Sequence, residues 1–149
     1  MIPAHFLLLR HRLLRKQQGG IALSSTGYIQ VHAYTGRAQI PLSGVAVTIT
    51  DLTGSAIAMR LTNRSGTLDA PVEVSVPDRS ASQTPDTGIL PYTAVNLYAR
   101  LENYETIEIE NLQIFPGTLT VQNLAMIPLS ELPDSWNKTE IFNTPAQNL

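Results

Sequence analysis

The chain has 149 residues, of which 43% are hydrophobic and 15% are charged, and its formal net charge at pH 7 is -2. This length predicts a single domain whose core is large enough to fold without disulfide bonds. The chain has no cysteine, which excludes a disulfide framework, a thiolate nucleophile and a cysteine-ligated zinc site.

The first 20 residues differ from the rest because they carry four bases and no acid: Arg10, Arg12, Arg15 and Lys16. Residues 21–149 are left with six bases and twelve acids, an acidic balance that argues against a nucleic-acid partner. Several leucines favour a helix that ends at Gly19–Gly20. The apolar run Phe6–Leu9 is too short for a signal peptide or a membrane span. We expect residues 1–24 to be a basic leader, helical or disordered, which either contacts a membrane or a partner or is a frayed end outside the native product.

From Gly27 onward, short runs rich in β-branched and aromatic residues alternate between apolar and polar positions. In YIQVHAY, for example, Ile29, Val31 and Ala33 share one side, and the polar and aromatic residues share the other. Glycine-containing turns separate the runs, as at Gly36, Gly54 and Gly117. Seven strands are predicted, near residues 27–35, 44–51, 55–63, 70–76, 92–102, 104–112 and 117–128.

These strands, with no helix-length segment between them, predict an all-β fold: a seven-stranded antiparallel Greek-key sandwich. One connection is long, from Pro77 to Pro91, and it is either the crossover between the two sheets or a functional loop. The expected organisation is a leader at 1–24, the sandwich at 25–129 and an irregular tail at 130–149.

Three stretches carry a resemblance to a known family: IPLSGVAVTITD at 40–51, TNRSGT at 62–67 and YARLENYETIEIENLQIFPGTLTVQNLAMIPL at 98–129. They resemble the carboxypeptidase regulatory-like domains, which are transthyretin-like (prealbumin-like) sandwiches. In this pattern Gly44 turns the chain into a strand, and Asn63 and Gly66 supply positive-φ positions of a hairpin turn. Asn103 stands where the family usually has glycine, and asparagine is the next best residue for that conformation.

A narrower resemblance rests on VPDRSASQTP, QIFPGTLTVQNLAMIPL and the ending LPDSWNKTEIFNTPAQNL. These stretches are similar to small proteins of gut Firmicutes that are commonly labelled spore cortex-lytic or spore-associated. The resemblance implies a spore or cell-envelope setting.

Few residues in the sandwich could carry chemistry. His32 is its only histidine, and neither a Gly-x-Ser-x-Gly elbow nor a phosphate-binding glycine loop is found. Glu108 and Glu110 are two apart and are expected on the wet face of an outer strand rather than as paired glycosidase carboxylates. We therefore predict no enzyme activity, no catalytic residues, no metal site and no cofactor.

Two families with related sandwiches offer alternatives. Transthyretin-like hydroxyisourate hydrolases have a first-strand histidine, which VHAYTGRAQIPLSGVAV resembles at His32, but this chain ends in TPAQNL rather than in their terminal motif. Isopeptide-bonded pilins need a lysine on a strand, whereas the only lysines are Lys16 and Lys138.

The tail carries two aromatic residues, Trp136 and Phe142, in a stretch of little periodicity. They either pack on the chain's own sandwich or contact a partner, such as a second copy or an envelope component. The function expected is a non-enzymatic structural or targeting module of the spore or cell envelope. The alternative is a peptidoglycan- or glycan-binding accessory to a cortex-lytic enzyme.

Overall fold

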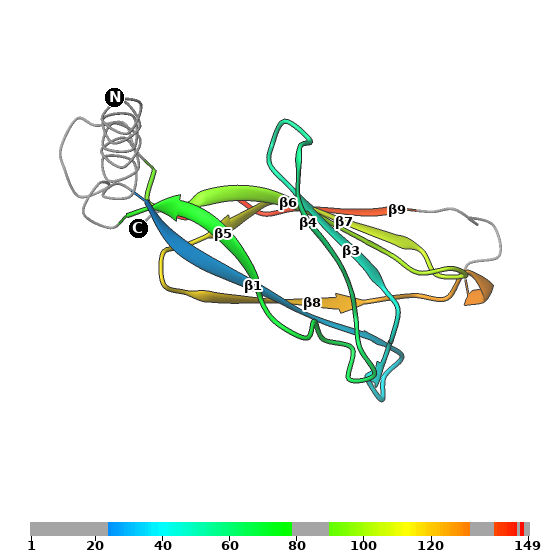
Figure 1. The fold of residues 1–149 in the computed structure, drawn as a ribbon. Helices are drawn as coiled ribbons and strands as arrows, with labels where there is room; N and C mark the ends of the chain where they lie inside the picture. The colour runs from blue at the N-terminus through cyan, green and yellow to red at the C-terminus, as the bar shows by residue number, and fades with distance from the viewer. Residues whose placement is uncertain (1–23, 79–89, 132–138, 146, 148–149) are drawn as a thin grey trace, which may run out of the picture.

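The computed structural model describes residues 24–78, 90–131, 139–145 and 147, which form nine β-strands and one turn of 3-10 helix (Figure 1). The strands are β1 (Ser24–Thr35), β2 (Ile40–Pro41), β3 (Ala46–Thr50), β4 (Ala56–Leu61), β5 (Val72–Pro77), β6 (Thr93–Arg100), β7 (Thr106–Ile114), β8 (Leu119–Ala125) and β9 (Thr139–Asn143), with the 3-10 turn η1 at Leu129–Glu131. The expected leader, most of the long connection and Trp136 lie outside the described residues.

The strands form two sheets. The five-stranded sheet has the order β4-β3-β6-β7-β9. In the four-stranded sheet β1 is central: Tyr28 pairs with both β5 and β8, and Tyr34 pairs with both β2 and β8. Strands β2 and β5 therefore share one side of β1, and β8 lies along the other. The expectation of an all-β fold with two sheets is confirmed.

The expectation that all strands pair antiparallel is wrong at two places. Strand β8 runs parallel to β1, and β9 runs parallel to β7. The chain leaves one sheet and passes through the other before it returns, so a returning strand is free to take either direction. Alternation in the sequence reveals which face of a strand is buried, but it carries no information about strand direction.

The core lies between the sheets and is built from the inward-facing residues of both. In β1, Ile29, Val31 and Ala33 are fully buried, as their alternation predicted. In β8 the apolar side chains differ in burial: Leu124 is fully buried, whereas Leu119 and Val121 are 52% and 55% exposed. The other buried apolar positions come from Val45, Val47, Ile49, Leu68, Val72, Val74, Val76, Val95, Leu97, Ala99, Ile107, Ile109, Leu112, Ile114 and Met126.

The segment 62–67 is not a hairpin turn. It leads from β4 in one sheet to β5 in the other, so it is a crossover between the sheets. Gly66 has the predicted positive φ of 76°, but Asn63 is not among the positive-φ residues. Asn63 acts through its side chain instead, because its Oδ1 accepts a hydrogen bond from the N–H of Ser65 at 2.9 Å. Such side-chain acceptors replace a backbone turn and need no left-handed residue.

The other two backbone positions expected from the family pattern are confirmed. Gly44 has φ of 80° directly before the buried Val45, where the chain turns toward β3. Asn103 has φ of 69° in the bend between β6 and β7. Both values lie in the region that glycine and asparagine tolerate best.

Candidate functional site

His32 lies on the outer face of the four-stranded sheet, opposite to the buried face of β1. Its ring is 5.2 Å from that of Tyr34, centroid to centroid, and both residues are partly exposed. This agrees with the alternation in YIQVHAY, which places the polar and aromatic residues on the side opposite to Ile29, Val31 and Ala33. Among the described residues, no three histidine or acidic side chains come close enough together to hold a metal ion. No helix in the described part of the chain is long and apolar enough to cross a membrane.

The acidic residues of the β6–β7 region differ in burial. Glu108 and Glu110 alternate with the buried Ile107 and Ile109 and are partly exposed, as expected for the wet face of β7. Glu105, by contrast, is fully buried, and its backbone N–H donates to the carbonyl oxygen of Ile127 at 3.0 Å. Glu105 stands two residues before Ile107, so the alternation places it on the same side as the buried Ile107 and Ile109 and opposite to Glu108 and Glu110.

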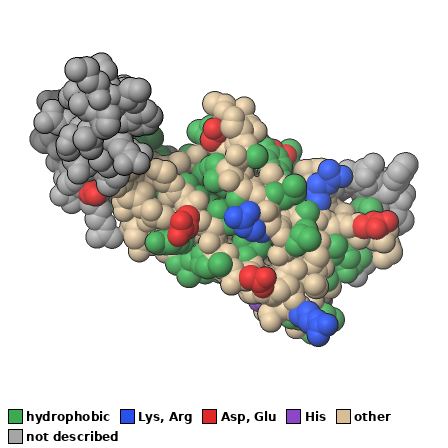
Figure 2. All heavy atoms as spheres, in the orientation of Figure 1, with side chains coloured by type: hydrophobic (Ala, Val, Ile, Leu, Met, Phe, Trp, Pro, Cys, Tyr) green, Lys and Arg blue, Asp and Glu red, His purple; other side chains and the backbone are tan. Residues whose placement is uncertain are grey.

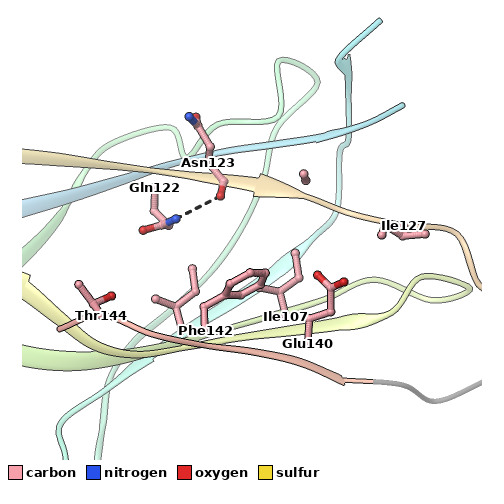
Figure 3. Close-up of a pocket in the computed structure, with 9 residues that line it drawn as sticks. Ile107, Gln122, Asn123, Ile127, Glu140, Phe142 and Thr144 are labelled. Carbon is pink, nitrogen blue, oxygen red and sulfur yellow. Dashed lines mark hydrogen bonds between the residues drawn. The ribbon is translucent and has the colours of Figure 1, made fainter. Parts of the chain in front are cut away.

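One concave feature is a groove between the edges of the two sheets, where β8 of one sheet faces β9 of the other (Figure 3). Its volume is about 320 Å³. It is lined by Ile107, Ile109, Gln122, Asn123, Ala125, Ile127, Glu140, Phe142 and Thr144. Phe142, which the sequence marked as a candidate partner contact, is therefore part of a site.

The register of β9 against β7 explains which side chains enter the groove. Glu140 pairs with Ile107, and Phe142 pairs with Ile109, so these four side chains share the inner face of the sheet. The two isoleucines are buried, whereas Phe142 is 51% exposed. In Figure 3 Phe142 and Ile107 lie close together, and the Glu140 carboxylate points toward the gap. The part of the groove formed by these four side chains is thus an apolar surface with one acid at its end.

The β8 wall supplies polar groups to the same groove. Gln122 faces inward in the register that buries Leu124, and its Nε2 donates to the carbonyl oxygen of Asn123 at 3.2 Å. Within the described residues β8 pairs only with β1, and β9 pairs only with β7. Each strand therefore has an outer edge on this side of the sandwich, where main-chain N–H and C=O groups are available for pairing.

The tail is ordered where it forms β9, which corrects the expectation that it is irregular throughout. Beyond the ladder to β7, the N–H of Thr144 donates to the Glu110 carbonyl at 3.1 Å. The Nε2 of Gln113 donates to the Pro145 carbonyl at 2.8 Å. The alternation in TEIFN, with Ile141 on one side and Glu140 and Phe142 on the other, is the signal that could have revealed this strand.

Trp136, the other candidate partner contact, lies outside the described residues. The groove residues that sequence reasoning missed are those on the β7 and β8 walls and Glu140. The alternation of Ile107 and Ile109 with Glu108 and Glu110 indicates core positions, but periodicity cannot show that a groove lies beside them.

Comparison with protein-family models finds no family that matches the chain, and comparison with curated proteins finds no match.

Proposed function

We propose that this protein is a non-enzymatic, prealbumin-like Greek-key module that serves as a structural or targeting element of a bacterial spore or cell envelope. The observation that carries the proposal is the groove between β8 and β9, in which an apolar floor lies between two strand edges. The envelope setting comes from the sequence resemblance. The family assignment is supported by the positive φ values of Gly44 and Asn103, two positions of the family pattern.

The occupant proposed for the groove is an extended segment of an envelope protein. Both walls are strands with outer edges, and an extended peptide binds such edges through main-chain hydrogen bonds while its alternate side chains enter a pocket. The exposed ring of Phe142 offers apolar contact to one such side chain. Glu140 at the end of the groove favours a basic residue nearby in the same segment.

Cosedimentation with isolated spore-envelope and cell-envelope fractions tests this proposal. The wild-type protein should pellet with the protein-containing fractions, and Phe142→Lys should reduce the bound fraction at least about tenfold, because a charge replaces the apolar contact. Ile40→Lys is the matched control, since Ile40 is exposed on β2, away from the groove. Equal binding by Phe142→Lys and wild type would contradict the proposal.

A second candidate is glycan binding, and one observation favours it. Tyr28, His32 and Tyr34 lie on the same outer face of β1, all partly exposed, and aromatic rings in a row can stack on sugar rings. Purified peptidoglycan, free of protein, separates the two functions in the same assay. Binding that Tyr34→Ala abolishes and Phe142→Lys leaves intact would favour the glycan-binding accessory.

The absence of catalysis is a prediction of its own. We expect no release of soluble fragments from peptidoglycan and no turnover of hydroxyisourate, because His32 is the only histidine in the sequence between residues 25 and 129, and the ring beside it is that of Tyr34. Turnover that disappears in His32→Ala would support the hydrolase alternative instead.

A further inference from the structure

A second hollow lies on the outer face of the five-stranded sheet, over strands β3, β6 and β7. Its volume is about 710 Å³. Across this face Thr48 of β3 pairs with Tyr98 of β6, and Tyr98 pairs in turn with Glu108 of β7. Arg100 stands two residues after Tyr98, so it projects from the same face of β6. All four residues line the hollow, which therefore brings together a hydroxyl, an aromatic ring, an acid and a base.

The turn between β3 and β4 forms one wall of this hollow through Gly54. This turn projects from the body of the molecule in Figure 1 and in Figure 2. Asp51 holds its shape, because the Oδ1 of Asp51 accepts hydrogen bonds from the N–H groups of Thr53 and Ser55. The wall is thus in place before any ligand binds, which reduces the entropy lost on binding.

The larger polar side chains in the hollow are not engaged by other groups of the protein. Among the described residues, no hydrogen bond or ion pair involves the side chain of Tyr98, Arg100 or Glu108. Arg100 and Glu108 are diagonal neighbours on β6 and β7, a spacing within reach of long side chains, yet they do not pair with each other. Arg100 is exposed, and the other two are partly exposed. Their donors and acceptors are therefore available to a ligand.

The place of the hollow in the sheet restricts what it can bind. Strands β3, β6 and β7 are each paired on both sides, so no main-chain edge is open here to an extended peptide. The charges of Arg100 and Glu108 balance, which does not favour a polyanion such as nucleic acid. The lining is mostly polar, which does not favour a hydrophobic ligand. A neutral ligand that both donates and accepts hydrogen bonds meets all of these conditions.

We propose that this hollow binds a neutral oligosaccharide. The C–H face of a sugar ring packs against the ring of Tyr98. Sugar hydroxyls both donate and accept, so they accept from the guanidinium of Arg100 and donate to the carboxylate of Glu108. The hollow extends from β3 to Thr139 at β9, three strand spacings or about 14 Å, which suits several sugar units rather than one. This site is separate from the groove between β8 and β9 and from the outer face of β1.

Nuclear magnetic resonance of the ¹⁵N-labelled full chain tests whether a sugar binds and where. The probes are three neutral tetrasaccharides: chitotetraose, cellotetraose and maltotetraose. At least one of them should shift the amide signals of Gly54, Tyr98 and Glu108, with saturation as its concentration rises. The amides of Tyr34 and Phe142, on the other sheet and in the groove, should not shift. The proposal is overturned if none of the three sugars shifts these signals, or if the shifts are confined to the surroundings of Tyr34 or Phe142.

Calorimetric titration with the sugar that binds tests the roles of the side chains. Tyr98→Ala should raise the dissociation constant at least about tenfold, because the ring contact is lost. Arg100→Gln and Glu108→Gln should each raise it severalfold, because a charge-assisted hydrogen bond becomes a neutral one. Arg100 is exposed, so its replacement leaves the packing of the sheets intact. Tyr34→Ala, at a partly exposed tyrosine of the other sheet, is the matched control and should leave the constant unchanged. A constant that Tyr34→Ala raises, and that Tyr98→Ala and Arg100→Gln leave unchanged, would overturn the proposal.

Discussion

Gly66 is the residue at which the crossover between the two sheets is most tightly constrained. Its φ of 76° disfavours any side chain, and a Cβ atom built there would collide with the carbonyl oxygen of Ala33. The N–H of Ala33 also donates to the Gly66 carbonyl at 2.8 Å, so the two segments cannot separate without losing a hydrogen bond. We predict that Gly66→Val lowers the free energy of unfolding by about 2 kcal/mol or more. Chemical denaturation measures this change.

Gly36 provides the control that separates backbone strain from collision. It has a similar φ of 72°, but no atom lies within 4 Å of the position its Cβ would take. Gly36→Ala should therefore cost only the backbone strain, about 1 kcal/mol, and clearly less than Gly66→Ala. Equal losses in the two alanine variants would show that the contact with Ala33 is not the constraint.

Asp51 organises the turn between β3 and β4 as a hydrogen-bond acceptor. Its Oδ1 accepts from the hydroxyl of Thr53, and also from the N–H groups of Thr53 and Ser55, each at 2.9 Å. The Thr53 hydroxyl is the largest cause, with the Ser55 N–H next, of a pKa held below the ordinary 3.8 of the carboxyl. These bonds stabilise the charged form, which is the form that accepts them best.

This lowered pKa predicts a pH dependence with a definite sign. A carboxyl whose folded pKa lies below its unfolded pKa adds stability above the unfolded value and loses it as the pH falls through the folded value. We expect Asp51→Asn to lower the melting temperature at pH 7, and the difference from wild type to shrink below about pH 4. Thermal denaturation of both proteins from pH 2 to 7 measures the trend, and a difference that grows toward low pH would contradict it.

At the scale of elements, β9 decides whether the β7 edge is covered. A chain that ends at Ser130 lacks β9, the β7–β9 ladder and the hydrogen bonds to Gln113. The inner side of Ile107 and Ile109 then gains solvent exposure. We predict a loss of about 2–4 kcal/mol in the free energy of unfolding, or aggregation through the newly exposed β7 edge. Chemical denaturation and light scattering of the truncated chain would detect either result.

The N-terminal end should behave in the opposite way. A chain that begins at Ser25 keeps all of the β1–β5 ladder except the pair made by Ser24. We expect its midpoint of chemical denaturation to match that of the full chain. A stable, monomeric chain ending at Ser130, or a strongly destabilised chain beginning at Ser25, would contradict this contrast between the two ends.

The same elements show what the sequence could and could not foretell. The seven strands other than β2 and β9 were predictable because each carries alternation or a β-branched run. Strand β9 has the same alternation at Glu140, Ile141 and Phe142, but prolines lie near it, and prolines argue against a strand. The parallel direction of β8 and the groove depend on which segments meet in space. No local pattern of residues records that information.

At the scale of the whole molecule, the central strands of the two sheets are paired on both sides and buried, whereas the edge strands are paired on one side and more exposed. Strand β1 is flanked by β5 and β2 on one side and β8 on the other, and β6 lies between β3 and β7. Their inward residues, such as Ile29 and Leu97, are fully buried. Strands β4 and β9, at the two ends of one sheet, have one neighbour each among the described residues and several exposed side chains. Separating an edge strand from its sheet therefore breaks one ladder of main-chain hydrogen bonds, whereas separating a central strand breaks two.

Native-state hydrogen exchange should reproduce this order. At low protein concentration we expect the paired amides of β1 and β6 to exchange only through global unfolding, and those of β4 and β9 to exchange at least about tenfold faster by local opening. Exchange in β9 as slow as in β6 would contradict the edge argument.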